Sequence, residues 1–133
     1  MANKRGSREY TTKQMGTAGE QLVAAYLTLH GVPSFTVPVD WPGYDVVAAP
    51  KGKCLQRISV KCRGTSNIQF HPSVLDWLAI VLINQAPYRI FVIPRGIAVQ
   101  RSKKYNKKGF RTLPVKKVPQ IFKEYENKFE LHG

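Results

Sequence analysis

Two apolar runs near the middle of the chain limit the folds that this sequence can adopt. Residues 75–83 read LDWLAIVLI and residues 88–93 read YRIFVI, and Pro87 and Pro94 bound the second run. A short apolar run can be a buried helix or a buried strand, and periodicity alone does not separate the two. The β-branched content and the two prolines favour strands. The sequence therefore predicts a pair of buried strands joined by a turn at 85–87.

A helix is predicted before these runs, over residues 12–30. Its helical spacing is carried by Leu22, Ala25, Tyr26 and Leu29. Gly31 is placed to end it in a left-handed cap. Gly16 and Gly19 weaken the first turns, which indicates either a close approach to another segment or a helix that begins nearer Thr17.

Further strands are predicted at 34–39, 44–49 and 55–62, where β-branched and aromatic residues alternate with Pro-Gly and Lys-Gly-Lys turns. They read as a meander. After Pro94 comes a basic, weakly helical piece and then a C-terminal helix with an apolar stripe. That stripe is Ile121, Phe122, Tyr125 and Phe129. Trp41 and Trp77 are expected in the core or in an interface.

The charge of the chain predicts a polyanionic partner. Lys and Arg number 21 against 8 Asp and Glu, which gives a formal net charge of +13. Each phosphate that such a protein neutralises releases condensed counterions, so nucleic acid is the favoured partner. A membrane surface would require a basic amphipathic helix with a bulky apolar face or a lipidation signal, and neither stands out.

The expected compartment is the cytoplasm. No segment has eighteen uncharged apolar residues, and the N-terminus lacks the apolar run of a secretory signal. Cys54 and Cys62 lack metal-binding spacing and are expected to be free thiols. The three histidines are scattered, so a histidine metal site or a Ser-His-Asp triad has no support in the sequence.

One pair of residues indicates a candidate catalytic site. Asp45 opens one predicted strand, and Lys61 lies near the end of the next. Side chains alternate along a strand, so Ser59 and Lys61 are expected on one face and Ile58, Val60 and Cys62 on the core face. Pairing of the two strands would bring Asp45 alongside Lys61. Taken singly, Asp45 can be a turn cap and Lys61 an edge charge.

In these residues the chain resembles the PD-(D/E)XK superfamily, the restriction-endonuclease-like nucleases, and is nearest in size and layout to archaeal Holliday-junction resolvases and small intron homing endonucleases. The resemblance covers roughly residues 16–94. Its pieces are Gly19-Glu20, Gly43-Tyr44-Asp45 and Ser59-Val60-Lys61. It implies an α/β fold with a mixed sheet of about five strands flanked by helices.

The resemblance also implies a metal-dependent DNA endonuclease. Asp45 would be the main ligand of Mg²⁺ or Mn²⁺, and Glu20 would bind the metal directly or through water. The backbone carbonyl of Val60 would be a further ligand, and Lys61 would position the attacking water. Mg²⁺ often needs only one or two protein carboxylates.

Ser59 departs from the pattern, because the superfamily usually has Asp or Glu at this position and in some branches Gln. A hydroxyl is a shorter and weaker ligand than a carboxylate. Three outcomes are open: the site works with fewer carboxylates, another acid such as Asp40 or Asp76 contributes, or the domain binds DNA without cutting it.

A basic segment follows the core. The DNA-binding candidates are Arg57, Arg63, Arg95, Arg101, Lys103, Lys104, Lys107, Lys108 and Arg111. Tyr105 and Phe110 lie among the lysines and can stack on unpaired bases.

The expected organisation is one domain, 1–133, with a flexible basic arm at 1–10 and the basic segment and C-terminal helix at 95–133. Cutting two strands with one site per chain favours a homodimer. The alternatives are a catalytically inactive DNA-binding protein on a nuclease fold and an RNA-binding basic protein.

Overall fold

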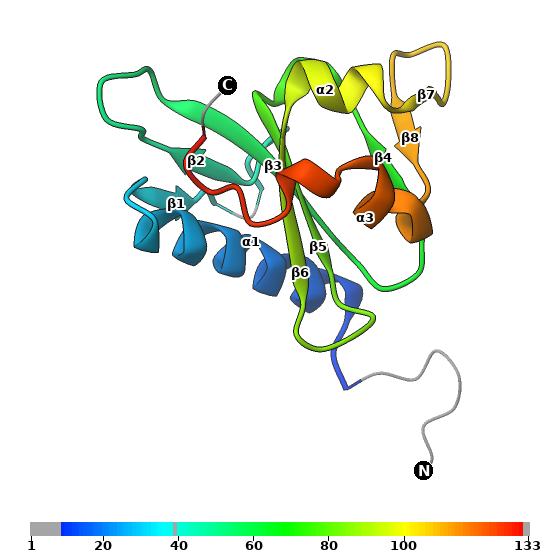
Figure 1. Cartoon of the computed structure of the whole chain (residues 1–133), viewed down its shortest axis with the longest axis horizontal. Helices are drawn as coiled ribbons and strands as arrows, with labels where there is room; N and C mark the ends of the chain where they lie inside the picture. Colours follow the sequence, from blue (N-terminus) through cyan, green and yellow to red (C-terminus); the bar gives the residue numbers. More distant parts are fainter. Residues whose placement is uncertain (1–8, 39, 132–133) are drawn as a thin grey trace.

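A five-stranded mixed sheet forms the centre of the fold (Figure 1). The structure is a computed structural model that describes residues 9–38 and 40–131. The sheet has the spatial order β1-β2-β3-β5-β6, in which β3 and β5 are parallel and the other neighbours are antiparallel. Its strands are β1 (Ser34–Thr36), β2 (Val46–Ala48), β3 (Gln56–Arg63), β5 (Trp77–Leu82) and β6 (Arg89–Pro94). The five predicted strands and the meander of the first three are confirmed.

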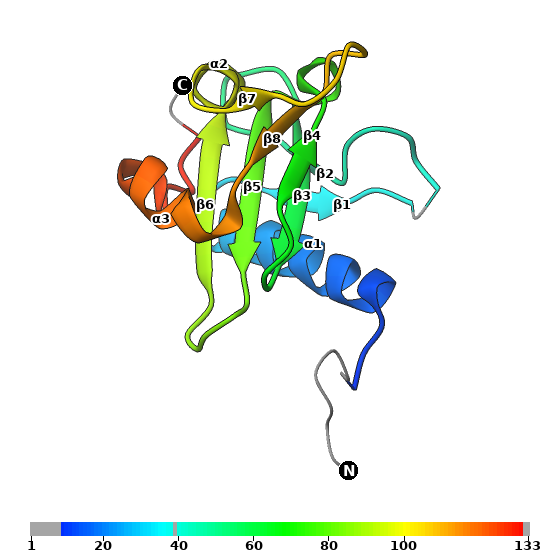
Figure 2. The same ribbon diagram turned by 90° about the vertical axis from the view of Figure 1, so that its right-hand side faces the viewer.

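Two apolar clusters cover the two faces of this sheet. Helix α1 (Thr12–Leu29) packs on one face, and the small sheet with the C-terminal segments packs on the other (Figure 2). Every residue of β5 is buried, because side chains of both orientations lie under one of these layers. The apolar run at 75–83 is continuous rather than alternating for this reason.

Helix α1 begins at a capping box and ends at a left-handed glycine. Thr11 accepts from the Gln14 N–H, the Gln14 side chain accepts from the Thr11 N–H, and Gly31 has a φ of +90°. Of the four residues that carry the predicted helical spacing, Leu22 packs against the core, but Ala25 is exposed, Tyr26 is 41 % exposed and Leu29 is 80 % exposed. The face that packs on the sheet is Met15, Gly19, Val23, Ala24 and Leu27. This second stripe repeats every four residues and is equally apolar, so the sequence alone did not choose between them.

A second sheet was not predicted. Its spatial order is β4-β8-β7, and it is antiparallel throughout. The strands are β4 (Ile68–Phe70), β7 (Lys103–Lys104) and β8 (Arg111–Leu113), with helix α2 (Arg95–Gln100) before the β7–β8 hairpin. A 3-10 turn, η1 (Pro72–Val74), leads from β4 to β5. Each strand of this second sheet has only two or three residues and lies outside the longer β-branched and aromatic runs from which strands were predicted.

The predicted C-terminal helix was also wrong. Residues 115–125 form three short pieces, η2 (Val115–Lys117), α3 (Val118–Ile121) and η3 (Lys123–Tyr125). Asn127 then has a φ of +59°, which ends the helical path. Phe122 is buried in the cluster under the small sheet, whereas Phe129 is buried in the cluster under α1. The apolar stripe is therefore divided between the two layers.

Several smaller expectations have clear outcomes. Residues 1–8 of the expected arm, and Val39 at the end of the first predicted strand, lie outside the described residues. Cys54 and Cys62 are free thiols. Trp77 is in the core, but Trp41 is 49 % exposed. Of the helices within the described ranges, none has both the length and the hydrophobicity that a membrane-spanning segment requires.

Candidate active site

The carboxylate of Asp45 is fixed at the point where β2 meets β3. The Asp45 N–H donates to the Ile58 carbonyl at 2.9 Å, and its own carbonyl accepts from the Val37 N–H at 3.1 Å. Its Oδ2 atom accepts from the Val60 N–H at 2.7 Å. The side chain thus reaches across β3 and binds the backbone one residue before Lys61.

Asp45 and Lys61 influence each other, as the predicted strand pairing requires. Burial raises the pKa of Asp45, and the Val60 N–H and the Lys61 ammonium group only partly oppose this effect. Burial and the nearby Arg63 lower the pKa of Lys61, and Asp45 partly opposes them. Within the described ranges these two side chains do not form an ion pair, and more than 4.0 Å separates the Lys61 Nζ atom from the Asp45 carboxylate oxygens. The two charges therefore interact through space in a half-buried setting.

Glu20 is brought to the same place by the close packing of α1 on β3. Gly19 is buried against Cys62, so closely that a Cβ atom at position 19 would lie 2.7 Å from the Cys62 Cβ atom. The close approach suggested by the helix glycines is therefore present at Gly19. Burial, and then the charge of Asp45, raise the pKa of Glu20 to about 6. A partly buried pair of carboxylates is the result.

These donors fit a hard divalent cation. Mg²⁺ prefers oxygen ligands and keeps several of its waters, so two carboxylates can be enough. The N–H and C=O groups of one strand residue point the same way. The Val60 carbonyl therefore points to the side where Asp45 lies, beyond the end of the β2–β3 ladder at Ile58. Asp45, Glu20 and this carbonyl can hold a metal ion together.

No other acidic side chain in the described residues joins Asp45 and Glu20 as a third candidate metal ligand. Within residues 9–38 and 40–131, no group of three or more His, Cys, Asp or Glu side chains is arranged to hold a metal ion. Asp76 is held by Arg57, whose N–H and guanidinium donate to it at 2.8 to 3.2 Å. Burial alone would raise the pKa of Asp76, but Arg57 more than offsets it and the pKa is lowered. Asp40 is exposed in a turn.

Ser59 lies on the face of β3 opposite Ile58, Val60 and Cys62, as expected, but it is buried there too and only 3 % exposed. Ser59 pairs with Leu78 of β5, and Leu78 belongs to the cluster beneath the small sheet. Both faces of β3 are therefore covered at this level, whereas Lys61 and Arg63 farther along the strand are half-buried.

Comparison with known proteins identifies the fold. No protein-family model matches the sequence, and no curated protein matches it. Among solved structures, the bacterial homing endonuclease I-Ssp6803I is similar with a TM-score of 0.65 and 16 % identity, over 91 % of each chain. Hjc, a Holliday junction resolvase from the archaeal hyperthermophile Archaeoglobus fulgidus, is similar with a TM-score of 0.57 and 16 % identity, over 82 % of this chain and 88 % of that one. The chain has a restriction-endonuclease-like fold.

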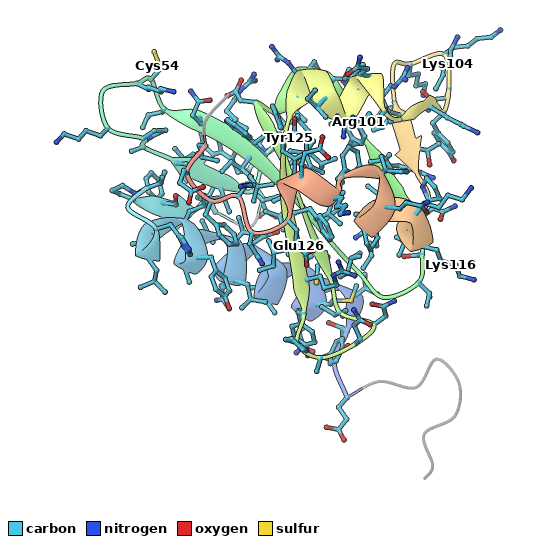
Figure 3. The ribbon with its side chains drawn as sticks, viewed as in Figure 1. Cys54, Arg101, Lys104, Lys116, Tyr125 and Glu126 are labelled. Carbon is cyan, nitrogen blue, oxygen red and sulfur yellow. The ribbon has the colours of Figure 1, made fainter. Side chains whose placement is uncertain are left out.

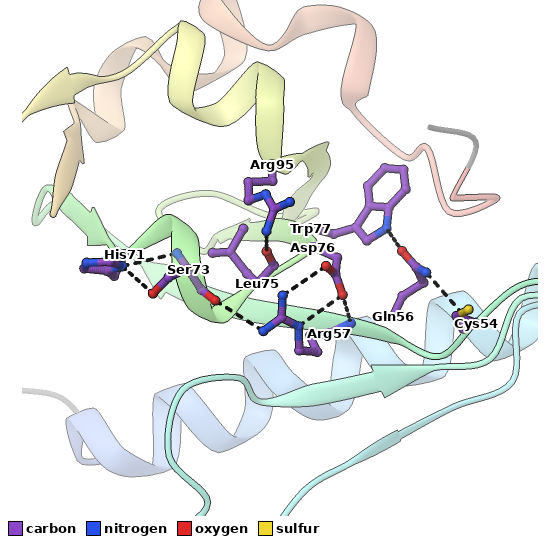
Figure 4. A network of polar contacts seen from close by, with 9 residues as sticks. All are labelled: Cys54, Gln56, Arg57, His71, Ser73, Leu75, Asp76, Trp77 and Arg95. Atoms are coloured by element: carbon purple, nitrogen blue, oxygen red, sulfur yellow. Dashed lines mark hydrogen bonds and ion pairs between the residues drawn. The ribbon is translucent and has the colours of Figure 1, made fainter. Parts of the chain in front are cut away.

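On this restriction-endonuclease-like fold, all five of the predicted DNA-binding arginines have partners within the protein. Arg57 binds Asp76 and the Ser73 carbonyl (Figure 4). Arg101 binds Glu124 and the Ile121 carbonyl. Elsewhere the guanidinium groups donate to backbone carbonyls: Arg63 to Cys62, Arg95 to Leu75, and Arg111 to Val99 and Ser102. These arginines help to hold the fold, which restricts what they can offer to a ligand.

The lysines are placed differently. Lys103, Lys104, Lys107 and Lys108 are all exposed on the β7–β8 hairpin. The Lys104 side chain points away from the rest of the protein (Figure 3). The Asn106 side chain accepts from the Lys108 and Phe110 N–H groups, so the hairpin has a defined shape. Asn106 and Gly109 favour a turn. The prediction considered only the charge of this segment and overlooked them.

His71 anchors this hairpin to the segment that precedes β5. Its Nε2 atom lies 3.0 Å from the Lys108 carbonyl oxygen, and its ring packs edge-on against Phe110. On the other side, the Nδ1 atom accepts from the Ser73 N–H and contacts the Ser73 hydroxyl (Figure 4). The basic hairpin is therefore fixed relative to β3 and β5.

Proposed function

We propose that the protein is a divalent-metal-dependent endonuclease that hydrolyses phosphodiester bonds in DNA. The observation that supports it best is the carboxylate of Asp45, which accepts from the Val60 N–H and lies close enough to Lys61 and Glu20 to interact with both through charge: Lys61 lowers the pKa of Asp45, and Asp45 raises the pKa of Glu20. The fold agrees with this function, because structures with the same fold include a homing endonuclease and a junction resolvase. The net charge of +13 agrees with a nucleic-acid substrate.

Each residue has a distinct role in this proposal. Asp45, Glu20 and the Val60 carbonyl hold Mg²⁺ or Mn²⁺. The metal supplies charge neutralisation at the phosphate and lowers the pKa of bound water. Lys61 orients the attacking water, and its lowered pKa helps it to share a proton. The lysines of the β7–β8 hairpin bind phosphates of the DNA backbone.

The test is cleavage of supercoiled, branched and single-stranded DNA with Mg²⁺ or Mn²⁺, and with EDTA. Asp45→Asn, Glu20→Gln and Lys61→Met should each lower the rate by at least about 100-fold. Glu130→Gln, which changes an exposed acid near the C-terminus, is the matched control and should cleave like the wild type. Equal activity of Asp45→Asn and wild type would remove Asp45 from the mechanism.

A second candidate is a DNA-binding protein that does not cut, and Ser59 favours it. A buried serine stands where the superfamily usually has an acid. Calorimetric titration with Mn²⁺ separates the two candidates. Binding that Asp45→Asn abolishes supports the enzyme, whereas DNA binding without any Asp45-dependent Mn²⁺ binding supports the second candidate.

The partner and the assembly follow from the same proposal. One active site per chain cuts one strand, so cleavage of both strands favours a homodimer. Sedimentation equilibrium with and without DNA measures this. Affinity for duplex DNA, branched DNA and structured RNA at matched salt tests the substrate, and a preference for RNA would favour an RNA-binding basic protein.

A further inference from the structure

An exposed indole lies in the loop that leads to Asp45. Trp41 is 49 % exposed and precedes Asp45 by four residues, in the loop between β1 and β2. An exposed tryptophan keeps a large apolar face in contact with water, which is unfavourable unless a partner covers it. Trp77, by contrast, is 6 % exposed and donates to the Gln56 side chain.

Several contacts hold Trp41 in place. The backbone N–H of Trp41 donates to the Pro38 carbonyl at 2.9 Å. Its ring meets the Tyr44 ring edge-on, with 6.2 Å between the centroids and 65° between the planes. Gly43 has a φ of +101° and packs so closely on η1 that a Cβ atom there would lie 3.2 Å from the Val74 Cβ atom. The indole is therefore presented by an anchored loop.

The same anchor joins this loop to the basic hairpin. Gly43 packs on Val74, and His71 at the start of this segment binds the Lys108 carbonyl and packs on Phe110. The loop, η1 and the hairpin consequently form a continuous part of the surface. A polyanion bound to the hairpin lysines would lie close to the loop that carries Trp41 and Asp45.

The local charge indicates which part of a polynucleotide would meet the indole. Asp40, the residue before Trp41, is exposed. A phosphate would be repelled there, whereas the face of a base carries no formal charge. Stacking on an aromatic side chain is the interaction that an unpaired base can make with any sequence.

We propose that Trp41 stacks on an unpaired nucleobase close to the phosphate that is cleaved. This inference rests on the proposed function and specifies its substrate as DNA with at least one unstacked base beside the cut. Single-stranded DNA and duplexes with a single-stranded flap meet this requirement, and a continuous duplex does not.

The test is a fluorescence titration, because the chain has only two tryptophans. The protein is titrated without metal, so that no cleavage occurs, using a short single-stranded oligonucleotide, a flapped duplex and a continuous duplex. Heparin serves as a polyanion without bases. Wild-type emission should fall with the first two DNAs and change little with heparin, and Trp41→Phe should lose this response. An equal response to heparin, or an unchanged response in Trp41→Phe, would overturn the proposal.

Affinity gives a second measurement. Trp41→Ala should weaken binding of the single-stranded oligonucleotide roughly tenfold, within the range of base stacking. Trp41→Tyr should keep most of the affinity. Leu29→Ala is the control, because it removes another exposed apolar side chain, 80 % exposed, at the last residue of α1. Unchanged affinity of Trp41→Ala, or concentration-dependent self-association that Trp41→Ala abolishes, would contradict the base-stacking role. Cleavage is not needed for either readout, so failure of the nuclease proposal would be seen separately.

Discussion

The backbone of Gly19 on α1 lies against the side chain of Cys62 on β3, and a Cβ atom at position 19 would be 2.7 Å from that of Cys62. This contact sets how closely the helix approaches the strand that carries Lys61. Because Glu20 follows Gly19 directly, the same contact determines how near the Glu20 carboxylate comes to Asp45. A residue without chemistry of its own thus positions a candidate metal ligand.

Gly19→Ala should lower the free energy of unfolding by about 1–3 kcal/mol, although alanine is the better helix former. The added methyl group forces α1 and β3 apart. Gly16→Ala is the matched control: no atom lies within 4 Å of a Cβ atom built there, so it should raise stability by about 1 kcal/mol. Urea unfolding of both variants measures the difference. If Gly19→Ala and Gly16→Ala both raised the free energy of unfolding, the contact between Gly19 and Cys62 would not limit the packing of α1 on β3.

Glu20→Gln should stabilise the metal-free protein at pH 7.5. The folded protein holds the Glu20 pKa at about 6, above the value of 4.5 expected without the fold. The folded state therefore binds this proton more tightly, and wild-type stability is lost as the pH rises through 6. The gain from Glu20→Gln should be below about 1 kcal/mol, because the carboxylate is partly exposed, and it should vanish below about pH 4.5. Thermal unfolding across this range checks it, and added Mg²⁺ should reverse the order at pH 7.5.

Ser59→Asp should lower the stability of the metal-free protein and make metal binding tighter. The new carboxylate would be buried, which is costly without a cation. With Mn²⁺ it becomes a further ligand, and binding to the folded state alone stabilises it. The measurement is the shift in melting temperature on adding Mn²⁺, compared with wild type and with Ser59→Asn. A smaller shift in Ser59→Asp than in wild type would argue against a metal at this place.

Replacing Lys103, Lys104, Lys107 and Lys108 by alanine should reduce the salt dependence of DNA binding. Each lysine that contacts phosphate contributes roughly 0.9 to the slope of log affinity against log salt for duplex DNA. The control is Arg57→Ala, because that guanidinium is bound to Asp76 and should contribute to stability instead. Fluorescence anisotropy over a series of salt concentrations measures both slopes. An unchanged slope in the lysine variant would exclude the hairpin as the phosphate contact.

The central sheet and the Asp45–Lys61 pair were predictable because they depend on local patterns. The strands are rich in apolar residues and bounded by turn residues, and the first three are consecutive in a meander. The small sheet was not predictable, because β4 pairs with β8, and Ile68 lies opposite Leu113. Nothing in either short segment encodes that pairing. The position of Trp41 was equally hidden, since an aromatic residue in a loop can be covered or exposed.

The pairing of β4 with β8 also determines how much of the chain is needed to fold. If the chain were cut after Pro94, β4 would lose its partner, and both layers of the core would lose side chains. Ala98, Leu113, Val115, Val118 and Phe122 complete one layer, and Phe129 and Leu131 complete the other. The smallest autonomous unit therefore extends well beyond the motif-bearing segment, and a fragment containing every candidate metal ligand would be expected to aggregate rather than to retain function.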